Sequence, residues 1–131
     1  MEKQIRQGAP DGIDVYFDNV GGDHLQAALN CMRPNGRIAL CGAISQYNAT
    51  EPVPGPNNLA IAIGMGLTLK GFIVSSYNHL RADFERDMSA WVNSGQVKYR
   101  ETVFEGISEM PNAFIGLFDG TNTGKMIVNL E

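Results

Sequence analysis

Two short segments combine glycine with a polar or sulfur-bearing side chain at the end of an apolar run. The first is Asn19–Gly22 (NVGG) and the second is Cys41-Gly42. Glycine permits positive φ angles and a close approach of the backbone to a ligand, although a plain chain reversal uses the same residues. A free cysteine is usually a small buried apolar side chain. No histidine is near Cys41 in sequence, so we expect no nucleophilic thiol there, and Cys31 is expected to be structural.

The segment Ala43–Asn57, which holds Tyr47, has neither helical nor strand periodicity. Loops of this length are more often functional than decorative. A phenol hydroxyl both donates and accepts hydrogen bonds, whereas the ordinary alternative is a tyrosine that covers surface. His24 and His79 stand alone, so we expect no metal site.

The elements that position these residues alternate between strand and helix. Apolar runs rich in β-branched and aromatic residues predict strands over Ile13–Asn19, Arg37–Cys41 and Thr68–Val74. Helical spacing from Leu25 to Met32, a turn at Pro34–Gly36 and a helix over Asn58–Gly66 connect them. This order is typical of a parallel sheet, in which ligands bind beyond the carboxyl ends of the strands. Asn19–Gly22, Cys41–Tyr47 and Ser75–Tyr77 should therefore share one edge of the sheet.

The rest of the chain predicts two helices and two short strands. An apolar stripe from Leu80 to Val92 places Trp91 in the core, and Gly95 ends that helix. Val103–Glu105 and Lys125–Leu130 predict strands, and Ser108 is expected to cap a helix that ends at Gly120. The polar opening Glu2–Pro10 is expected to be a frayed end.

Composition narrows the class of protein. The chain has 131 residues, the size of one domain, and a formal net charge of −4, which disfavours nucleic acid and anionic membranes as partners. It holds no apolar stretch of about 20 residues and does not open like a signal peptide. Two cysteines outside any Cys-x-x-Cys pair suggest a reducing, cytoplasmic location.

Three runs, in the right order, carry a family resemblance: Asp14–Gly22, Gly36–Asn48 and Gly120–Lys125. From about Gly8 to its end the chain resembles the leukotriene B4 12-hydroxydehydrogenase, prostaglandin reductase and alkenal double-bond reductase branch of the medium-chain dehydrogenase/reductase superfamily. The resemblance implies an α/β fold, the C-terminal half of a doubly wound (Rossmann-type) parallel sheet. Residues 1–78 would be part of the nucleotide-binding domain, and residues 79–131 would belong partly to the substrate domain.

The same resemblance implies that the chain is a C-terminal fragment. Family members are longer, and they carry a glycine-rich pyrophosphate turn, whereas this chain has no G-x-G-x-x-G. The implied cofactor is NADP(H), and Tyr47 would be the catalytic hydroxyl. The implied cofactor-binding residues are Asn19, Cys41, Gly42, Ser45, Tyr47, Phe72, Ile73, Val74, Asn122 and Gly124.

The function implied is NADPH-dependent reduction of the carbon–carbon double bond of an α,β-unsaturated aldehyde or ketone, a small enal or enone. A homodimer would form through the edge strand Thr68–Val74, as it does in similar enzymes. Three alternatives stay open: a quinone oxidoreductase of the same superfamily, an S-adenosylmethionine-dependent methyltransferase fragment suggested by Met32–Arg37, and a non-catalytic oligomerisation domain.

Overall fold

The computed structural model describes residues 1–131, and its contacts divide the chain into two compact units, Met1–His79 and Leu80–Glu131. Each unit is described by itself. None of the helices in either unit combines the length and apolar character needed to cross a bilayer.

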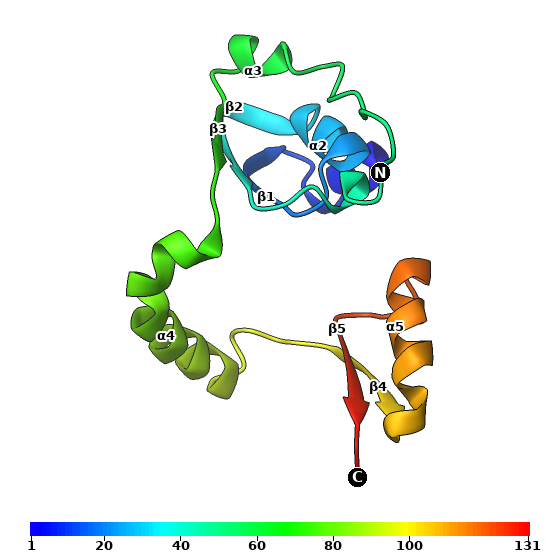
Figure 1. The fold of residues 1–131 in the computed structure, drawn as a ribbon. Coiled ribbons are helices and arrows are strands. Elements are labelled where there is room, and N and C mark those ends of the chain that lie inside the picture. The colour runs from blue at the N-terminus through cyan, green and yellow to red at the C-terminus, as the bar shows by residue number, and fades with distance from the viewer. The chain divides into compact units, whose positions relative to one another are not determined.

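The first unit is a three-stranded parallel sheet with helices (Figure 1). Its elements are α1 (Glu2–Gly8), β1 (Ile13–Asp18), α2 (Gly22–Leu29), β2 (Met32–Leu40), the 3-10 turn η1 (Ile44–Gln46), α3 (Ile61–Gly64), β3 (Thr68–Gly71) and the 3-10 segment η2 (Val74–Leu80). The strand order is β1-β2-β3, with Tyr16 opposite Ile38 and Ile38 opposite Leu69. The predicted parallel arrangement of the three strands is confirmed.

The core lies between α2 and one face of this sheet. Leu29, Met32 and Ile38 are buried there, and Tyr16 and Leu25 pack against them. On the opposite face of β1, Val15 and Phe17 are 52% and 55% exposed. Because side chains alternate across a strand, one face of β1 is covered and the other is open.

Met32, expected in the helix that contains Leu25, instead begins β2. Four further boundaries in this unit differ from the sequence-based prediction. The first residues form helix α1 and are not the frayed end that was expected. Arg6 pairs with Glu2 within the helix and donates to the Asn30 carbonyl, which attaches the helix to the rest of the unit. The predicted turn Pro34–Gly36 lies inside β2 as an irregularity, where Asn35 has φ 63° and pairing passes from Ile13–Met32 to Val15–Arg37.

The other two elements are shorter than predicted. The helix expected over Asn58–Gly66 is only the single turn α3, and the strand expected over Thr68–Val74 ends at Gly71. Beyond Phe72, whose N–H still reaches the Leu40 carbonyl, no β2 residue remains to pair with the chain.

The second unit contains α4 (Arg81–Asn93), β4 (Glu101–Glu105), the 3-10 turn η3 (Ile107–Glu109), α5 (Met110–Asp119) and β5 (Lys125–Asn129). Strands β4 and β5 are parallel neighbours, and α5 connects them. Gly95 follows α4 with φ 73°, and Gly120 ends α5 with φ 65°, as predicted for helix ends.

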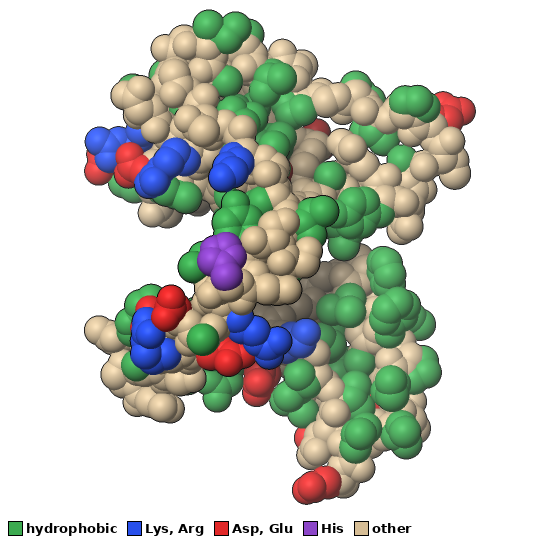
Figure 2. Space-filling view, turned by 60° about the vertical axis from the view of Figure 1, so that its left-hand side comes forward, with side chains coloured by type: hydrophobic (Ala, Val, Ile, Leu, Met, Phe, Trp, Pro, Cys, Tyr) green, Lys and Arg blue, Asp and Glu red, His purple; other side chains and the backbone are tan.

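Two expectations for the second unit are wrong. Ser108 lies within η3 rather than at the cap of α5, which Glu109 precedes without a side-chain cap. Trp91 is 44% exposed and is not a core residue, because no residue of α4 is buried. Figure 2 shows opposite charges intermixed over α4 and hydrophobic side chains gathered on the surface around α5.

Candidate active site at the carboxyl ends of the strands

The turn after β1 and the loop after β2 are hydrogen-bonded to each other. Cys41 N and Gly42 N both donate to the Asp18 carbonyl, at 2.8 and 3.1 Å, and Ile44 N donates to the Asn19 carbonyl at 3.1 Å. The structure therefore brings Asn19, Cys41 and Gly42 to one edge of the sheet, as their strand-end positions predicted.

Ser45 joins the same two segments. Its hydroxyl donates to the Val20 carbonyl at 2.6 Å, and its backbone N–H donates to the same oxygen at 3.1 Å. The sequence-based role of Ser45 was cofactor binding, and the structure shows that its hydroxyl proton already holds the turn. The oxygen of that hydroxyl keeps acceptor capacity for a ligand.

Gly21 and Gly22 are required by both backbone conformation and space. Their φ angles are 71° and 50°, a region that residues with a side chain rarely adopt. A Cβ on Gly21 would lie 3.2 Å from the Ala43 Cβ, and one on Gly22 would lie 3.1 Å from Ser45 Oγ. The glycines thus let the turn pack directly against the loop after β2.

Tyr47 folds back over the end of β2. The Ala43 N–H donates to Tyr47 Oη at 3.1 Å, although the tyrosine as a whole is 66% exposed. A Cβ on Gly42 would lie 3.0 Å from this oxygen and 3.2 Å from the Asn19 carbonyl, so the glycine makes room for the hydroxyl. Tyr47 Oη accepts from Ala43 and donates to no group of the chain, so its proton can be donated to a ligand.

A cavity of about 320 Å³ opens at this edge. Its lining residues are Asp18, Gly21, Gly22, Leu25, Leu40, Cys41, Gly42, Ala43, Gln46, Tyr47 and Pro56. Cys41 is partly exposed in it, whereas Cys31 is buried elsewhere, and burial raises the pKa of the Cys31 thiol. Cys31 is therefore structural, as expected.

Asp18 is the functional candidate that sequence reasoning missed. It is the last residue of β1 and is 1% exposed. Its Oδ1 accepts hydrogen bonds from Val20 N and Gly21 N, each at 3.0 Å, and from Tyr16 Oη at 3.3 Å. The available signal was an acidic residue at the end of a mostly apolar strand, directly before the glycine turn. Carboxylates are rarely buried at such a position unless they have partners.

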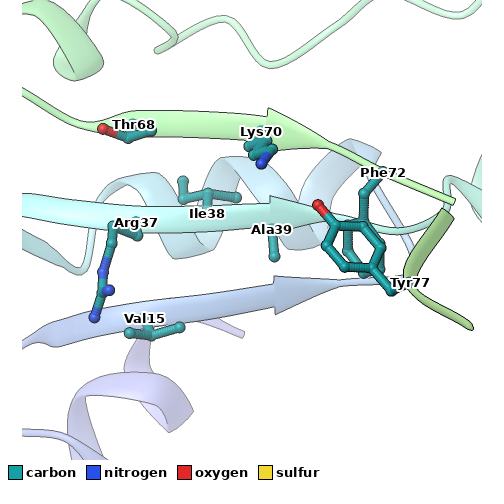
Figure 3. Close-up of a pocket in the computed structure, with 8 residues that line it drawn as sticks. All are labelled: Val15, Arg37, Ile38, Ala39, Thr68, Lys70, Phe72 and Tyr77. Carbon is teal, nitrogen blue, oxygen red and sulfur yellow. The ribbon is translucent and has the colours of Figure 1, made fainter. Parts of the chain in front are cut away.

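Phe72 directly follows β3 and lies on the exposed face of the sheet, beside Phe17. Its ring meets Phe17 and Tyr77 edge-on, with centroid distances of 5.7 and 5.6 Å. Figure 3 shows Tyr77 beside Phe72 at the carboxyl end of a second hollow of about 420 Å³, whose floor is the three strands. Ile73 and Val74 follow with exposed side chains. Because these side chains have no polar atoms, only the main chain of the two residues could contribute specific polar contacts.

Asn122 and Gly124 belong to the second unit and are described there alone. Asn122 Nδ2 donates to the Gly124 carbonyl at 2.7 Å, which leaves Asn122 Oδ1 free. Gly124 has φ 76°, and a Cβ there would collide with the Arg100 carbonyl. The structure thus explains this glycine by local packing.

No three side chains of His, Cys, Asp or Glu gather within residues 1–131 in a way that could hold a metal ion. His79 stacks on Tyr77 and His24 lies in α2, each without other ligands nearby. We assign no chemical step to a metal.

A parallel sheet with glycine turns and a cavity at its strand ends defines one half of a doubly wound nucleotide-binding fold. The chain belongs to the zinc-binding dehydrogenase family, whose model matches residues 1–94. This membership confirms the resemblance to medium-chain dehydrogenases and gives no support to a methyltransferase. The zinc in the family's description finds no ligand set among these residues.

Two reductases and one solved structure are similar to this chain over nearly its whole length. Prostaglandin reductase 1 of Bos taurus is 47% identical over 130 residues, which are 98% of this chain and 39% of that protein. The NADP(+)-dependent 2-alkenal reductase of Nicotiana tabacum is 44% identical and covers 98% of this chain and 37% of its own length. The NADPH complex of CurA from Vibrio vulnificus superposes with a TM-score of 0.79 at 38% identity, over 99% of this chain and 40% of CurA. The chain thus spans about two-fifths of the length of these relatives.

Proposed function

We propose that the protein to which this chain belongs reduces the carbon–carbon double bond of α,β-unsaturated aldehydes or ketones with NADPH. The observation that carries this proposal is the hydroxyl of Tyr47, which the Ala43 N–H holds over Gly42 at the carboxyl ends of the strands. The names of the relatives, prostaglandin reductase and 2-alkenal reductase, support the substrate class.

The residues at the edge fit the nicotinamide end of the cofactor. The close packing at Gly21, Gly22 and Gly42 leaves main chain rather than side chains facing the cavity, which suits a flat ring and a ribose. Asn19, Ser45 and the main chain of Phe72–Val74 would hold polar groups of the cofactor, and Cys41 would pack against it. Asn122 and Gly124 would contribute from the second unit. When bound, NADPH supplies a hydride.

Tyr47 would act on the substrate. As the double bond accepts a hydride at its β-carbon, negative charge gathers on the carbonyl oxygen. Tyr47 Oη accepts from the Ala43 N–H and donates its own proton to no group of the chain. The hydroxyl can therefore donate a hydrogen bond to the substrate oxygen and stabilise the developing charge.

Three further statements belong to this proposal. Residues 1–78 would be part of the nucleotide-binding domain, and residues 79–131 would partly belong to the substrate domain. A homodimer would form through β3, whose outer edge has no strand partner in the sheet. The location would be cytoplasmic, where the free thiols Cys31 and Cys41 stay reduced.

The proposal is tested in the complete protein that contains this chain. NADPH oxidation is followed with a 2-alkenal, an enone and a quinone as alternative substrates. Tyr47→Phe is expected to lower kcat with the alkenal by about tenfold or more, because one hydrogen bond to the developing charge is lost.

Tyr99→Phe is the matched control. It also removes a phenol oxygen, but from a residue that is 68% exposed in the second unit. This control should leave kcat unchanged. Full activity of a folded Tyr47→Phe variant would overturn the role of Tyr47. A complete protein that oxidises NADPH only with the quinone would overturn the substrate class and favour a quinone oxidoreductase.

A further inference from the structure

The buried carboxylate of Asp18 is hydrogen-bonded to the backbone of the Asn19–Gly22 turn. Its Oδ1 gathers the N–H groups of Val20 and Gly21 together with the hydroxyl of Tyr16. On the opposite side of the same turn, the Val20 carbonyl accepts from both the hydroxyl and the N–H of Ser45. The N–H groups of the turn are thus bound by Asp18, and its Val20 carbonyl is bound by Ser45.

The second carboxylate oxygen of Asp18 indicates that an aspartate is not the most stabilising residue for this buried position. Asp18 Oδ2 is buried and has no hydrogen-bond partner. An unpaired acceptor in the interior lowers the free energy of unfolding, and a buried charge lowers it further. A carboxylate at this place is therefore better explained by what Oδ1 does for the turn than by stability alone.

We propose that Asp18 is a positioning residue for cofactor binding, which fixes the Asn19–Gly22 turn in the shape that receives the nicotinamide end of the dinucleotide. The identity of the ligand rests on the proposed function above. Asp18 lines the cavity at this edge, but its buried oxygens act through the turn.

The physical reason is the freedom of two consecutive glycines. Gly21 and Gly22 both have positive φ angles, and an unrestrained pair would sample many other conformations. Ordering such a turn at the moment of binding would weaken affinity, whereas a turn that is already ordered avoids this cost. The carboxylate orders it in advance by holding the N–H groups of Val20 and Gly21.

The test uses the isotope-labelled 131-residue chain, with amide signals observed by NMR during titration with NADPH at millimolar concentrations. Asp18→Ala removes the acceptor, whereas Asp18→Asn keeps one acceptor oxygen for the turn and replaces the unpartnered oxygen with an amide. Tyr16→Phe is the control, because it removes only the longest of the three hydrogen bonds to Oδ1.

Asp18→Ala is expected to speed amide exchange at Val20 and Gly21 by about tenfold or more and to weaken NADPH binding by about fivefold or more. Asp18→Asn and Tyr16→Phe should stay within about twofold of the wild type in both measurements. Signals of β2 and α2 in each variant report whether the unit is still folded. If Asp18→Asn does not fold, the comparison of Asp18→Ala with Tyr16→Phe carries the test.

Two outcomes separate this inference from the function on which it rests. Unchanged exchange at Val20 and Gly21 in a folded Asp18→Ala chain overturns the inference whatever NADPH does. Faster exchange with NADPH affinity equal to that of the wild type also overturns it, because the turn would then be ordered without consequence for binding. A wild-type chain whose Asn19–Gly22 signals do not respond to NADPH also overturns the positioning role, whereas the proposed function is tested separately, in the complete protein.

Discussion

At the scale of single residues, Tyr16 and Asp18 share the covered face of β1 and modify each other. Tyr16 Oη donates to Asp18 Oδ1, and the tyrosine packs against the core of Leu29, Met32 and Ile38. Burial, followed by the charge of Asp18 and this hydrogen bond, raises the pKa of Tyr16 above its ordinary value of 10.0. Ionisation of Tyr16 is therefore less favourable in the folded chain than in the unfolded one.

This shift predicts a loss of stability in alkali. Since the folded pKa lies above the unfolded one, the contribution of Tyr16 is fully present below about pH 10 and is lost as the pH rises through the folded pKa. The measurement is the free energy of unfolding of the wild type and of Tyr16→Phe between pH 7 and 11. The difference between them should be constant up to about pH 9 and should then move in favour of Tyr16→Phe.

Tyr99→Phe serves as the reference for general alkaline effects, because Tyr99 is an exposed residue of the second unit. If the wild type and Tyr16→Phe lose stability in parallel over the whole range, burial and Asp18 do not raise the pKa of Tyr16.

At the scale of elements, α2 and the sheet it covers depend on one small apolar cluster. Leu29 and Ile38 are each 1% exposed, and Met32 completes the cluster. Charged surface pairs such as Arg81–Glu85 on α4 are exposed and contribute little by comparison. Most of the free energy of unfolding of the first unit should therefore depend on the packing interface between α2 and β2.

We expect Leu29→Ala to destabilise the first unit by about 2–5 kcal/mol, because it leaves a cavity at a fully buried position. Leu59→Ala is the matched control, since Leu59 is 50% exposed in the same unit, and it should cost less than about 1 kcal/mol. Urea titration followed through the amide signals of β1, β2 and β3 measures both. Equal effects of the two substitutions would show that Leu29 is not the centre of the core.

At the scale of the whole molecule, much of the apolar surface remains exposed. The open face of β1 exposes Val15 and Phe17, and α5 exposes Phe114 and Phe118, which are 62% and 70% accessible. Figure 2 shows many hydrophobic side chains, with other atoms between them, on the surface around α5. Apolar patches of this kind are typical of interfaces, and the free edge of β3 adds unpaired backbone groups.

The 131-residue chain by itself is therefore expected to self-associate in solution. Light scattering should give a mass above the 14.3 kDa of one chain, and the mass should rise with concentration. Phe118→Glu should lower it, whereas Ser108→Glu, which adds the same charge at another exposed position, should not. A monodisperse wild-type monomer at high concentration would contradict this expectation.

Sequence patterns were sufficient for the parts of the molecule that depend on local periodicity. The parallel order of the three strands, the helix of Leu25 and Leu29, and the meeting of Asn19 with Cys41 follow from alternating apolar runs and from the rule that ligands bind at strand ends. The glycine ends of α4 and α5 follow from the conformation that only glycine adopts readily.

Tertiary structure alone decided the rest, because it depends on contacts between segments that no local pattern records. The hydrogen bond from Ala43 to Tyr47 and the space at Gly42 arise where two loops meet. The end of β3 at Gly71 depends on where β2 stops offering partners. The apolar stripe with Trp91 predicts a core, yet a stripe is buried only where another surface covers it. The role of Asp18 became visible only once the turn lay against its carboxylate, because the sequence shows an acid but not which N–H groups surround it.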